Sequence, residues 1–186
     1  HFLVESLSRL WLAKRLDNAD GVIFILRLPT KQPAGFVEKV FSLLIPHLKV
    51  LFLTEPATVE TLVIPDQLAH LKSGYIQGHD AHRPLFDELK TIDASSPKKV
   101  YISRSDLKFD EGRFLGEKLL EENLEREGYV IIHPQKISLE EQLKIYTNAE
   151  KLIFADGSAF HLYVFVANPE QQTFDVWRRK NHADFH

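Results

Sequence analysis

Three short apolar runs alternate with helical patterns in the second half of the chain, and this alternation limits the folds available to it. The runs span residues 99–103, 129–133 and 151–155. Apolar side chains recur at helical spacing between them, over residues 111–127 and 138–149. Ser138 with Glu141 forms a capping box at the start of the second helix. Strands and helices in this order predict a parallel sheet with helices on its faces.

The first half of the chain shows the same alternation in a less regular form. Its pattern predicts an amphipathic helix over residues 2–16, strands at 22–28, 50–53 and 60–64, and helices at 35–44 and 85–92. Residues 67–83 read as a loop, and residues 173–177 as a last strand. The segment 94–97, Ala-Ser-Ser-Pro, is the best linker signal. We therefore expect an α/β protein with two domains, residues 1–93 and 94–186.

Composition excludes several classes of protein. The chain has 186 residues, 44% of them hydrophobic, which is enough for a sizeable core. Its formal charge of -3 and the lack of a basic-aromatic stripe argue against a nucleic-acid partner. The absence of cysteine excludes disulfides and suits a reducing, cytoplasmic location. Without methionine, and opening directly on a helical pattern, the chain is expected to be a fragment, whose missing regions would carry any peripheral membrane association.

Ligands of parallel α/β sheets bind at the carboxyl ends of the strands, where this sequence has residues 103–105, 133–135 and 156–158. Residues 156–159, Asp-Gly-Ser-Ala, follow a strand and open a helix, where free backbone N–H groups favour a phosphate. Equally, Asp156 or Ser158 could simply cap that helix. Arg104 follows the first strand, and its guanidinium could grip a diphosphate with two hydrogen bonds. The alternative is an ordinary surface arginine.

Other candidates have weaker local signals. Arg113 and Glu117 lie four residues apart on the predicted helix and could form a solvated ion pair. The histidine groups near residues 79–82 and 182–186 lack the spacing of a metal site, so no metal is expected. The sequence contains no Gly-rich dinucleotide fingerprint and no Walker loop, so dinucleotide redox chemistry and nucleotide hydrolysis lack support.

Four motifs in order resemble the C-terminal half of glycosyltransferase family 61. They are YISR at residues 101–104, Arg113 with Glu117, ISLEEQ at 137–142, and ADGSAFHLYVF at 155–165. The opening HFLVESLSRL resembles the family's first helix, with Ser8 where proline is usual. The family includes capsular-polysaccharide transferases, xylosyltransferases and N-acetylglucosaminyltransferases.

The resemblance implies two Rossmann-like halves facing a cleft, the GT-B fold. It implies inverting, metal-independent transfer of a sugar from a nucleotide-sugar donor to a hydroxyl of a glycan acceptor, with no cofactor. The first half would bind the acceptor, with His1 as general base and Glu5 orienting it; alternatively, His1 is a poorly ordered terminal residue. The implied donor-binding residues are Arg104, Arg113, Glu117, Asp156, Gly157, Ser158 and Ala159, with Gln142 as a lesser candidate.

Three residues depart from the family pattern and keep other functions open. Asp156 stands where the family has histidine and would bind ribose or sugar hydroxyls, and Gly116 stands where it has asparagine. Together with Ser8, these departures suit a non-catalytic nucleotide-sugar or polysaccharide-binding module. A sugar-nucleotide epimerase or a hydrolase of the same architecture is a further alternative.

Overall fold

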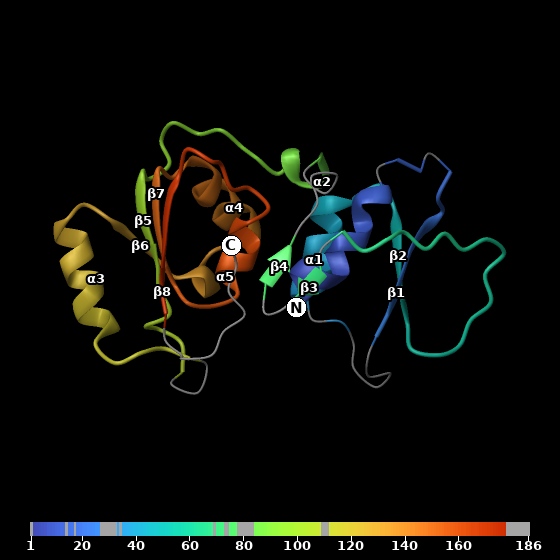
Figure 1. The fold of residues 1–186 in the computed structure, drawn as a ribbon, viewed down its shortest axis with the longest axis horizontal. Coiled ribbons are helices and arrows are strands. Elements are labelled where there is room, and N and C mark those ends of the chain that lie inside the picture. The colour runs from blue at the N-terminus through green and yellow to red at the C-terminus, as the bar shows by residue number, and fades with distance from the viewer. Residues whose placement is uncertain are drawn as a thin grey trace. The chain divides into compact units, whose positions relative to one another are not determined.

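A computed structural model describes residues 2–13, 15–16, 18–26, 33, 35–68, 70–72, 75–77, 84–108 and 112–177. These residues form two compact units, one ending at Phe86 and the other beginning at Asp87 (Figure 1). Thr91 and Asp93 belong to the second unit, because both hydrogen-bond through their backbones to the Asn148 side chain. None of the helices in the described ranges is long and apolar enough to cross a membrane.

The second unit is built on a parallel four-stranded sheet, as the apolar runs predict. Its strands are β5 (Lys99–Ile102), β6 (Val130–Ile132), β7 (Lys151–Ala155) and β8 (Gln172–Val176). They lie in the order β6-β5-β7-β8. The chain therefore passes from β5 to β6 on one side of β5, and then crosses to β7 and β8 on the other side. The α/β class with a parallel sheet is thereby confirmed.

Helices cover the two faces of this sheet (Figure 1). On one face lie α4 (Leu139–Asn148) and α5 (Ala159–Tyr163), and on the other lies α3 (Glu117–Arg126). Phe154 of β7 packs edge-to-face on Tyr146, with ring centroids 5.6 Å apart. The predicted cap of α4 is confirmed, since the Glu141 N–H donates to Ser138 Oγ at 3.1 Å.

The helix predicted over residues 111–127 begins only at Glu117. Gly116 has a φ of 80°, a left-handed conformation that cannot continue a right-handed helix. The helix therefore starts after this glycine, and residues 112–116 approach it as turns and irregular chain. This late start places Glu117, rather than a solvent-facing residue, at the first position of α3.

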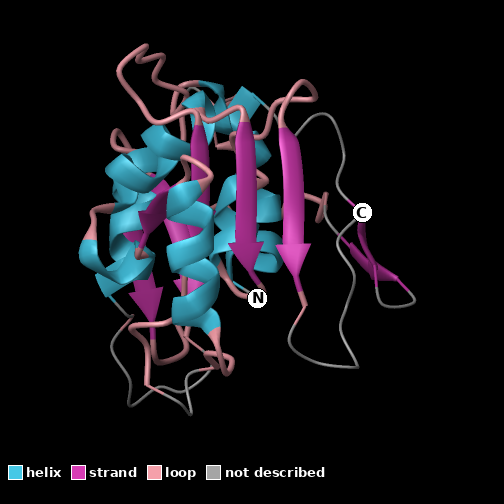
Figure 2. Ribbon diagram, turned by 90° about the vertical axis from the view of Figure 1, so that its left-hand side faces the viewer, coloured by secondary structure: helices cyan, strands magenta, loops and turns pink. Residues whose placement is uncertain are grey.

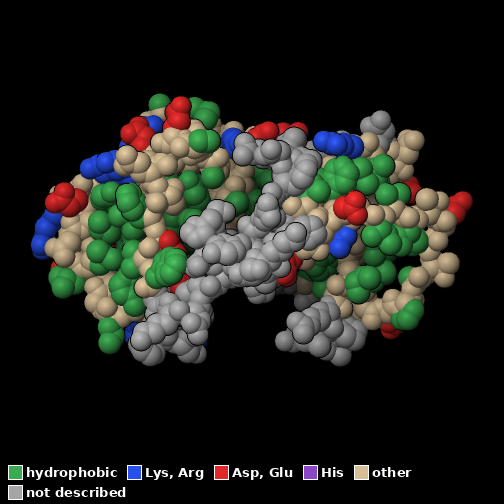
Figure 3. Space-filling model, viewed as in Figure 1, with side chains coloured by type: hydrophobic (Ala, Val, Ile, Leu, Met, Phe, Trp, Pro, Cys, Tyr) green, Lys and Arg blue, Asp and Glu red, His purple; other side chains and the backbone are tan. Residues whose placement is uncertain are grey.

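Helix α3 covers only part of its sheet face (Figure 2). Leu119 of α3 is 61% exposed and Phe174 of β8 is 55% exposed. Hydrophobic side chains gather on the surface over this part of the second unit (Figure 3). The opposite face is closed, because Leu152 and Phe154 are fully buried beneath α4 and α5.

The first unit is a smaller α/β layer. Strands β1 (Gly21–Ile25) and β2 (Lys49–Leu53) pair in parallel, joined through α1 (Gly35–Leu44), the helix predicted over the same residues. The opening segment is helical as expected, but it is a π-helix over Phe2–Ser6 and a 3-10 helix over Leu7–Leu12. The buried core of this unit includes Leu7, Phe41 and Ile45. An edge-to-face cluster of aromatic rings extends from Phe41 to the surface, through Phe2, Phe24, Phe52 and the 45% exposed Phe36.

The strand predicted over residues 60–64 is wrong. This segment pairs with no strand among the described residues, and Leu62, Val63 and Ile64 are 57%, 52% and 73% exposed. β-propensity produces a strand only where a neighbouring strand can pair. Here the following chain is instead held by the first helical segment, since Arg9 and Trp11 donate to the carbonyls of residues 65 and 66.

The remaining elements of the first unit are short. Strands β3 (His70–Lys72) and β4 (Tyr75–Gln77) form an antiparallel hairpin within the region predicted as a loop. Helix α2 spans Pro84–Asp87, which is only the first part of the helix predicted over residues 85–92.

Candidate functional site

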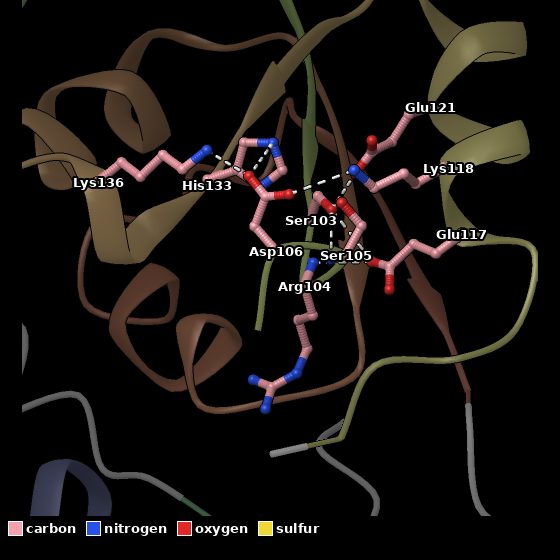
Figure 4. Close-up of polar contacts among 9 residues, drawn as sticks. All are labelled: Ser103, Arg104, Ser105, Asp106, Glu117, Lys118, Glu121, His133 and Lys136. Carbon is pink, nitrogen blue, oxygen red and sulfur yellow. Dashed lines mark hydrogen bonds and ion pairs between the residues drawn. The ribbon is translucent and has the colours of Figure 1, made fainter. Parts of the chain in front are cut away.

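The carboxyl end of β5 is organised around one carboxylate (Figure 4). Oε1 of Glu117 accepts hydrogen bonds from the Arg104 backbone N–H at 2.7 Å, the Tyr101 hydroxyl at 3.1 Å and Ser103 Oγ at 3.2 Å. The Glu117 residue is only 2% exposed. Three donors on one oxygen hold the start of α3 against the end of β5.

The alternation of β5 explains this network. Residues two apart in a strand face the same side, so Tyr101 and Ser103 both point toward α3. Burial and the negative charge of Glu117 raise the pKa of Tyr101, so its hydroxyl stays protonated and donates. Ser103 Oγ also lies within hydrogen-bond reach of Glu121, and its single proton serves one carboxylate at a time.

The side chain of Arg104 leaves this network and crosses to the end of β7. Figure 4 shows it pointing away from the carboxylates. A Cβ built on Gly157 would overlap with Nη1 of Arg104 and lie 3.0 Å from its Cζ. Nε of Arg104 also donates to the Gly112 carbonyl at 3.3 Å. The guanidinium therefore lies against the backbone of residue 157, and a Cβ at this position would displace it.

Arg104 and Gly157 meet where the order of strands in the sheet reverses direction. β5 and β7 are neighbours, and the chain runs in opposite directions from them, to β6 on one side and to β8 on the other. Such a reversal in an open parallel sheet leaves a crevice at the carboxyl ends of the strands, where ligands of these folds bind. Two of the predicted donor-binding residues lie there together.

The other predicted residues of this turn surround Gly157. Asp156 is half-buried. Burial of the His161 imidazole lowers the pKa of His161, and the nearby charge of Asp156 opposes this shift. Ser158 is exposed and makes no side-chain capping hydrogen bond, while Ala159 opens α5, a helix of only five residues. The capping alternative therefore finds no support at Ser158.

Arg113 and Glu117 line a pocket of about 190 Å³ at the start of α3. Its other lining residues are Ser105, Phe114, Leu115, Gly116 and Lys118. Arg113 is exposed, whereas Glu117 is buried, so the alternative reading of the two residues as a solvated ion pair does not hold for Glu117. The late start of α3 is the cause, because it turns the first side chain of the helix toward the sheet.

The remaining candidates lie elsewhere. His1 is outside the described residues, and Glu5 is exposed, with its carbonyl accepting from Ser8 Oγ at 2.6 Å. Nε2 of Gln142 donates to the Pro134 carbonyl at 2.9 Å, which ties α4 to the 3-10 helix Pro134–Lys136 after β6. Both histidine groups also fall outside the described residues, and no cluster able to hold a metal occurs within the described ranges.

One charged cluster at the same sheet edge was not predicted. Asp106, just past β5, pairs with Lys136 and lies 3.6 Å from Lys118 Nζ and 3.6 Å from His133 Nε2. The hydrogen bond from Lys136 is the main cause that lowers the pKa of Asp106. The available signal was positional, since Asp106 and His133 both follow a predicted strand and so share the edge of the sheet.

The order of motifs matches a known family across nearly the whole chain. The family model described as Glycosyltransferase 61 matches residues 1–173. No curated protein and no solved structure matches the chain significantly. The family match spans both units and includes every candidate residue of the sheet edge. The chain therefore belongs to glycosyltransferase family 61.

Proposed function

We propose that this glycosyltransferase takes a sugar from a nucleotide-sugar donor and that the donor diphosphate lies at the switch point between β5 and β7. One observation carries the proposal: the Arg104 guanidinium lies against Gly157 at the end of the neighbouring strand. A guanidinium can donate two parallel hydrogen bonds to phosphate oxygens. Gly157 itself carries no side chain, so the guanidinium can lie directly against its backbone.

The chemistry of transfer needs fixed positive groups at this place. When the glycosidic bond to the diphosphate breaks, the leaving group gains negative charge, and prepositioned donors stabilise that charge. The backbone N–H of Arg104 is held by Glu117, which limits the positions open to its guanidinium. Arg113, exposed beside the same end of the sheet, would contribute a second cation. On this proposal the reaction needs no metal.

The remaining parts of the proposal concern the acceptor and stereochemistry. A base removes the proton of the acceptor hydroxyl while the sugar is transferred with inversion. We assign that base to His1, oriented by Glu5, and acceptor recognition to the first half within a GT-B arrangement. Asp156 would bind ribose or sugar hydroxyls of the donor. The proposed setting is polysaccharide biosynthesis, such as capsule assembly, in the cytoplasm.

Product analysis tests the reaction. The protein is incubated with nucleotide-sugars, with and without glycan acceptors, and the products are identified by mass spectrometry. The anomeric configuration of the new linkage is then read by NMR. Transfer to the acceptor with inverted configuration is expected, and Arg104→Ala should lower it strongly while the circular dichroism spectrum stays unchanged. Retention of configuration would contradict the stereochemical part alone.

A binding module is the second candidate, and Asp156 favours it. Asp156 directly precedes Gly157 in the chain, so it would bring negative charge toward the proposed diphosphate. A protein that has lost its reaction would still bind a nucleotide-sugar but would release no nucleoside diphosphate over long incubation with any acceptor. Turnover by the wild-type chain would exclude this candidate.

A further inference from the structure

The Asp106 carboxylate ties the loop after β5 to two other segments at the carboxyl edge of the sheet (Figure 4). Lys136, from the 3-10 helix after β6, donates a hydrogen bond to Oδ2 of Asp106. Nε2 of His133, at the end of β6, lies 3.6 Å from Oδ2, and Nζ of Lys118 in α3 lies 3.6 Å from Oδ1. Asp106 therefore connects the end of β5 with both α3 and the chain after β6.

The backbone of Arg104 is held on both sides. Before residue 104, the Arg104 N–H donates to Glu117 at 2.7 Å. After it, the Arg104 carbonyl accepts from the Leu107 N–H at 3.0 Å, which closes a turn over residues 104–107. Asp106 lies within this turn and anchors it through its side chain. Because the rotamers open to a side chain depend on its own backbone angles, this turn limits the directions open to the Arg104 guanidinium.

Asp106 and Arg104 have opposite charges and lie two residues apart, yet their side chains point in different directions. Figure 4 shows Asp106 directed toward Lys118, His133 and Lys136, and the Arg104 guanidinium pointing away from them. The hydrogen bond from Lys136 lowers the pKa of Asp106, so its carboxylate is charged at neutral pH. Asp106 is thus held by partners on the far side of the turn from the guanidinium.

We propose that Asp106 is a positioning residue, which holds the turn after β5 so that the Arg104 guanidinium stays against Gly157. This inference rests on the proposed function, in which Arg104 binds the donor diphosphate. Asp106 points away from that guanidinium and acts through it rather than on the donor. Lys118 and Lys136 are 72% and 59% exposed, and exposed ion pairs contribute little to stability. Loss of the Asp106 contacts should therefore loosen the turn without unfolding the second unit.

Two substitutions remove the main contact from its two sides. Asp106→Asn and Lys136→Gln each remove one charge and nearly keep the size of the side chain. Since both act on one contact, the double variant should resemble the more affected single variant. Asp93→Asn is the matched control, because it removes another carboxylate that pairs with a lysine, Lys144, at 2.6 Å. Asp93 precedes β5, whereas Arg104 follows it, so the control contact lies toward the other end of the strand.

The test measures the order of the turn and the binding of inorganic diphosphate in the folded variants. NMR relaxation reports the order of the amides of residues 105–107 and of the Arg104 Nε–H. We expect amide order parameters of about 0.85 in the wild type and Asp93→Asn, and below about 0.6 in Asp106→Asn and Lys136→Gln. The Nε–H should lose order in the same two variants. By isothermal titration calorimetry, both should bind inorganic diphosphate about fivefold more weakly, and Asp93→Asn should bind it as the wild type does.

The outcomes distinguish this inference from the proposed function. If the Arg104 Nε–H is as ordered in Asp106→Asn as in the wild type, Asp106 does not position it, and the inference is overturned whether or not diphosphate binds. Measurable but equal diphosphate binding by the wild type and both turn variants would overturn it as well. If instead the Nε–H loses order in both variants, but the wild type binds neither inorganic diphosphate nor UDP, GDP or CDP, the donor proposal fails and the positioning role of Asp106 remains.

Discussion

The guanidinium of Arg104 occupies the space that a side chain on residue 157 would need. A Cβ on Gly157 would overlap with Nη1 and come within 3.3 Å of Cδ. Gly157 is not among the described glycines with positive φ, so its backbone tolerates other residues and the requirement for glycine is one of space. The two residues follow neighbouring strands, so their contact lies between the carboxyl ends of β5 and β7, where we propose that the diphosphate binds.

Gly157→Ala should therefore impair nucleotide binding without unfolding the protein. The new methyl group must push the guanidinium away, and we expect binding of the donor nucleotide to weaken by about tenfold or more, the worth of a charge-assisted hydrogen bond. Isothermal titration calorimetry measures this directly. Gly35→Ala is the matched control, because a Cβ there meets nothing within 4 Å. Equal binding by both variants would remove residue 157 from the site.

Tyr101→Phe should destabilise the fold, whereas Tyr146→Phe should not. Both side chains are fully buried, but the Tyr101 hydroxyl donates to Glu117 while the Tyr146 hydroxyl has no partner among the described residues. Loss of the first bond should lower the free energy of unfolding by about 1–2 kcal/mol, and loss of the second hydroxyl should leave it unchanged or raise it. Urea denaturation of the two variants compares them, and similar losses would refute the assigned roles.

Asp93 should make the second unit sensitive to acid. The hydrogen bond from Lys144 is the main cause that lowers the pKa of Asp93 below its ordinary 3.8, and the paired atoms are 2.6 Å apart. Because the folded state binds the proton less readily than the unfolded chain, this stabilisation is complete above pH 3.8 and is lost progressively below it. The urea midpoint of the wild type should exceed that of Asp93→Asn at neutral pH, and the difference should shrink below pH 3.8. A difference that does not change with pH would contradict this account.

Local patterns predicted the elements of the second unit better than those of the first. Residues 151–155 form the predicted strand, and the Ser138 cap starts α4 where expected, because both depend on nearby residues. The left-handed Gly116 explains the late start of α3, and glycine at that position was a visible signal. The apolar run 60–64 failed as a strand because pairing depends on a distant partner that sequence spacing does not reveal.

The candidate site depends both on local sequence patterns and on the order of strands in the sheet. Arg104 and Gly157 were each recognisable as residues that follow strands, but their contact depends on β5 and β7 being neighbours. Strand order is a property of the whole fold and is not encoded in local spacing. The burial of Glu117 could have been anticipated from Tyr101 and Ser103, two hydroxyls on one face of an otherwise apolar strand that needed a polar partner.

The most direct test of the central claim is a thermal-shift screen of the wild type and Arg104→Ala against UDP, GDP, CMP and their common sugars, with and without EDTA. A ligand at 100 times its Kd should stabilise the protein by about 2.7 kcal/mol. We predict that one nucleotide class raises the melting temperature of the wild type, that EDTA leaves this shift unchanged, and that Arg104→Ala abolishes it. No shift with any nucleotide, or an equal shift in Arg104→Ala, would contradict a donor site at the switch point between β5 and β7.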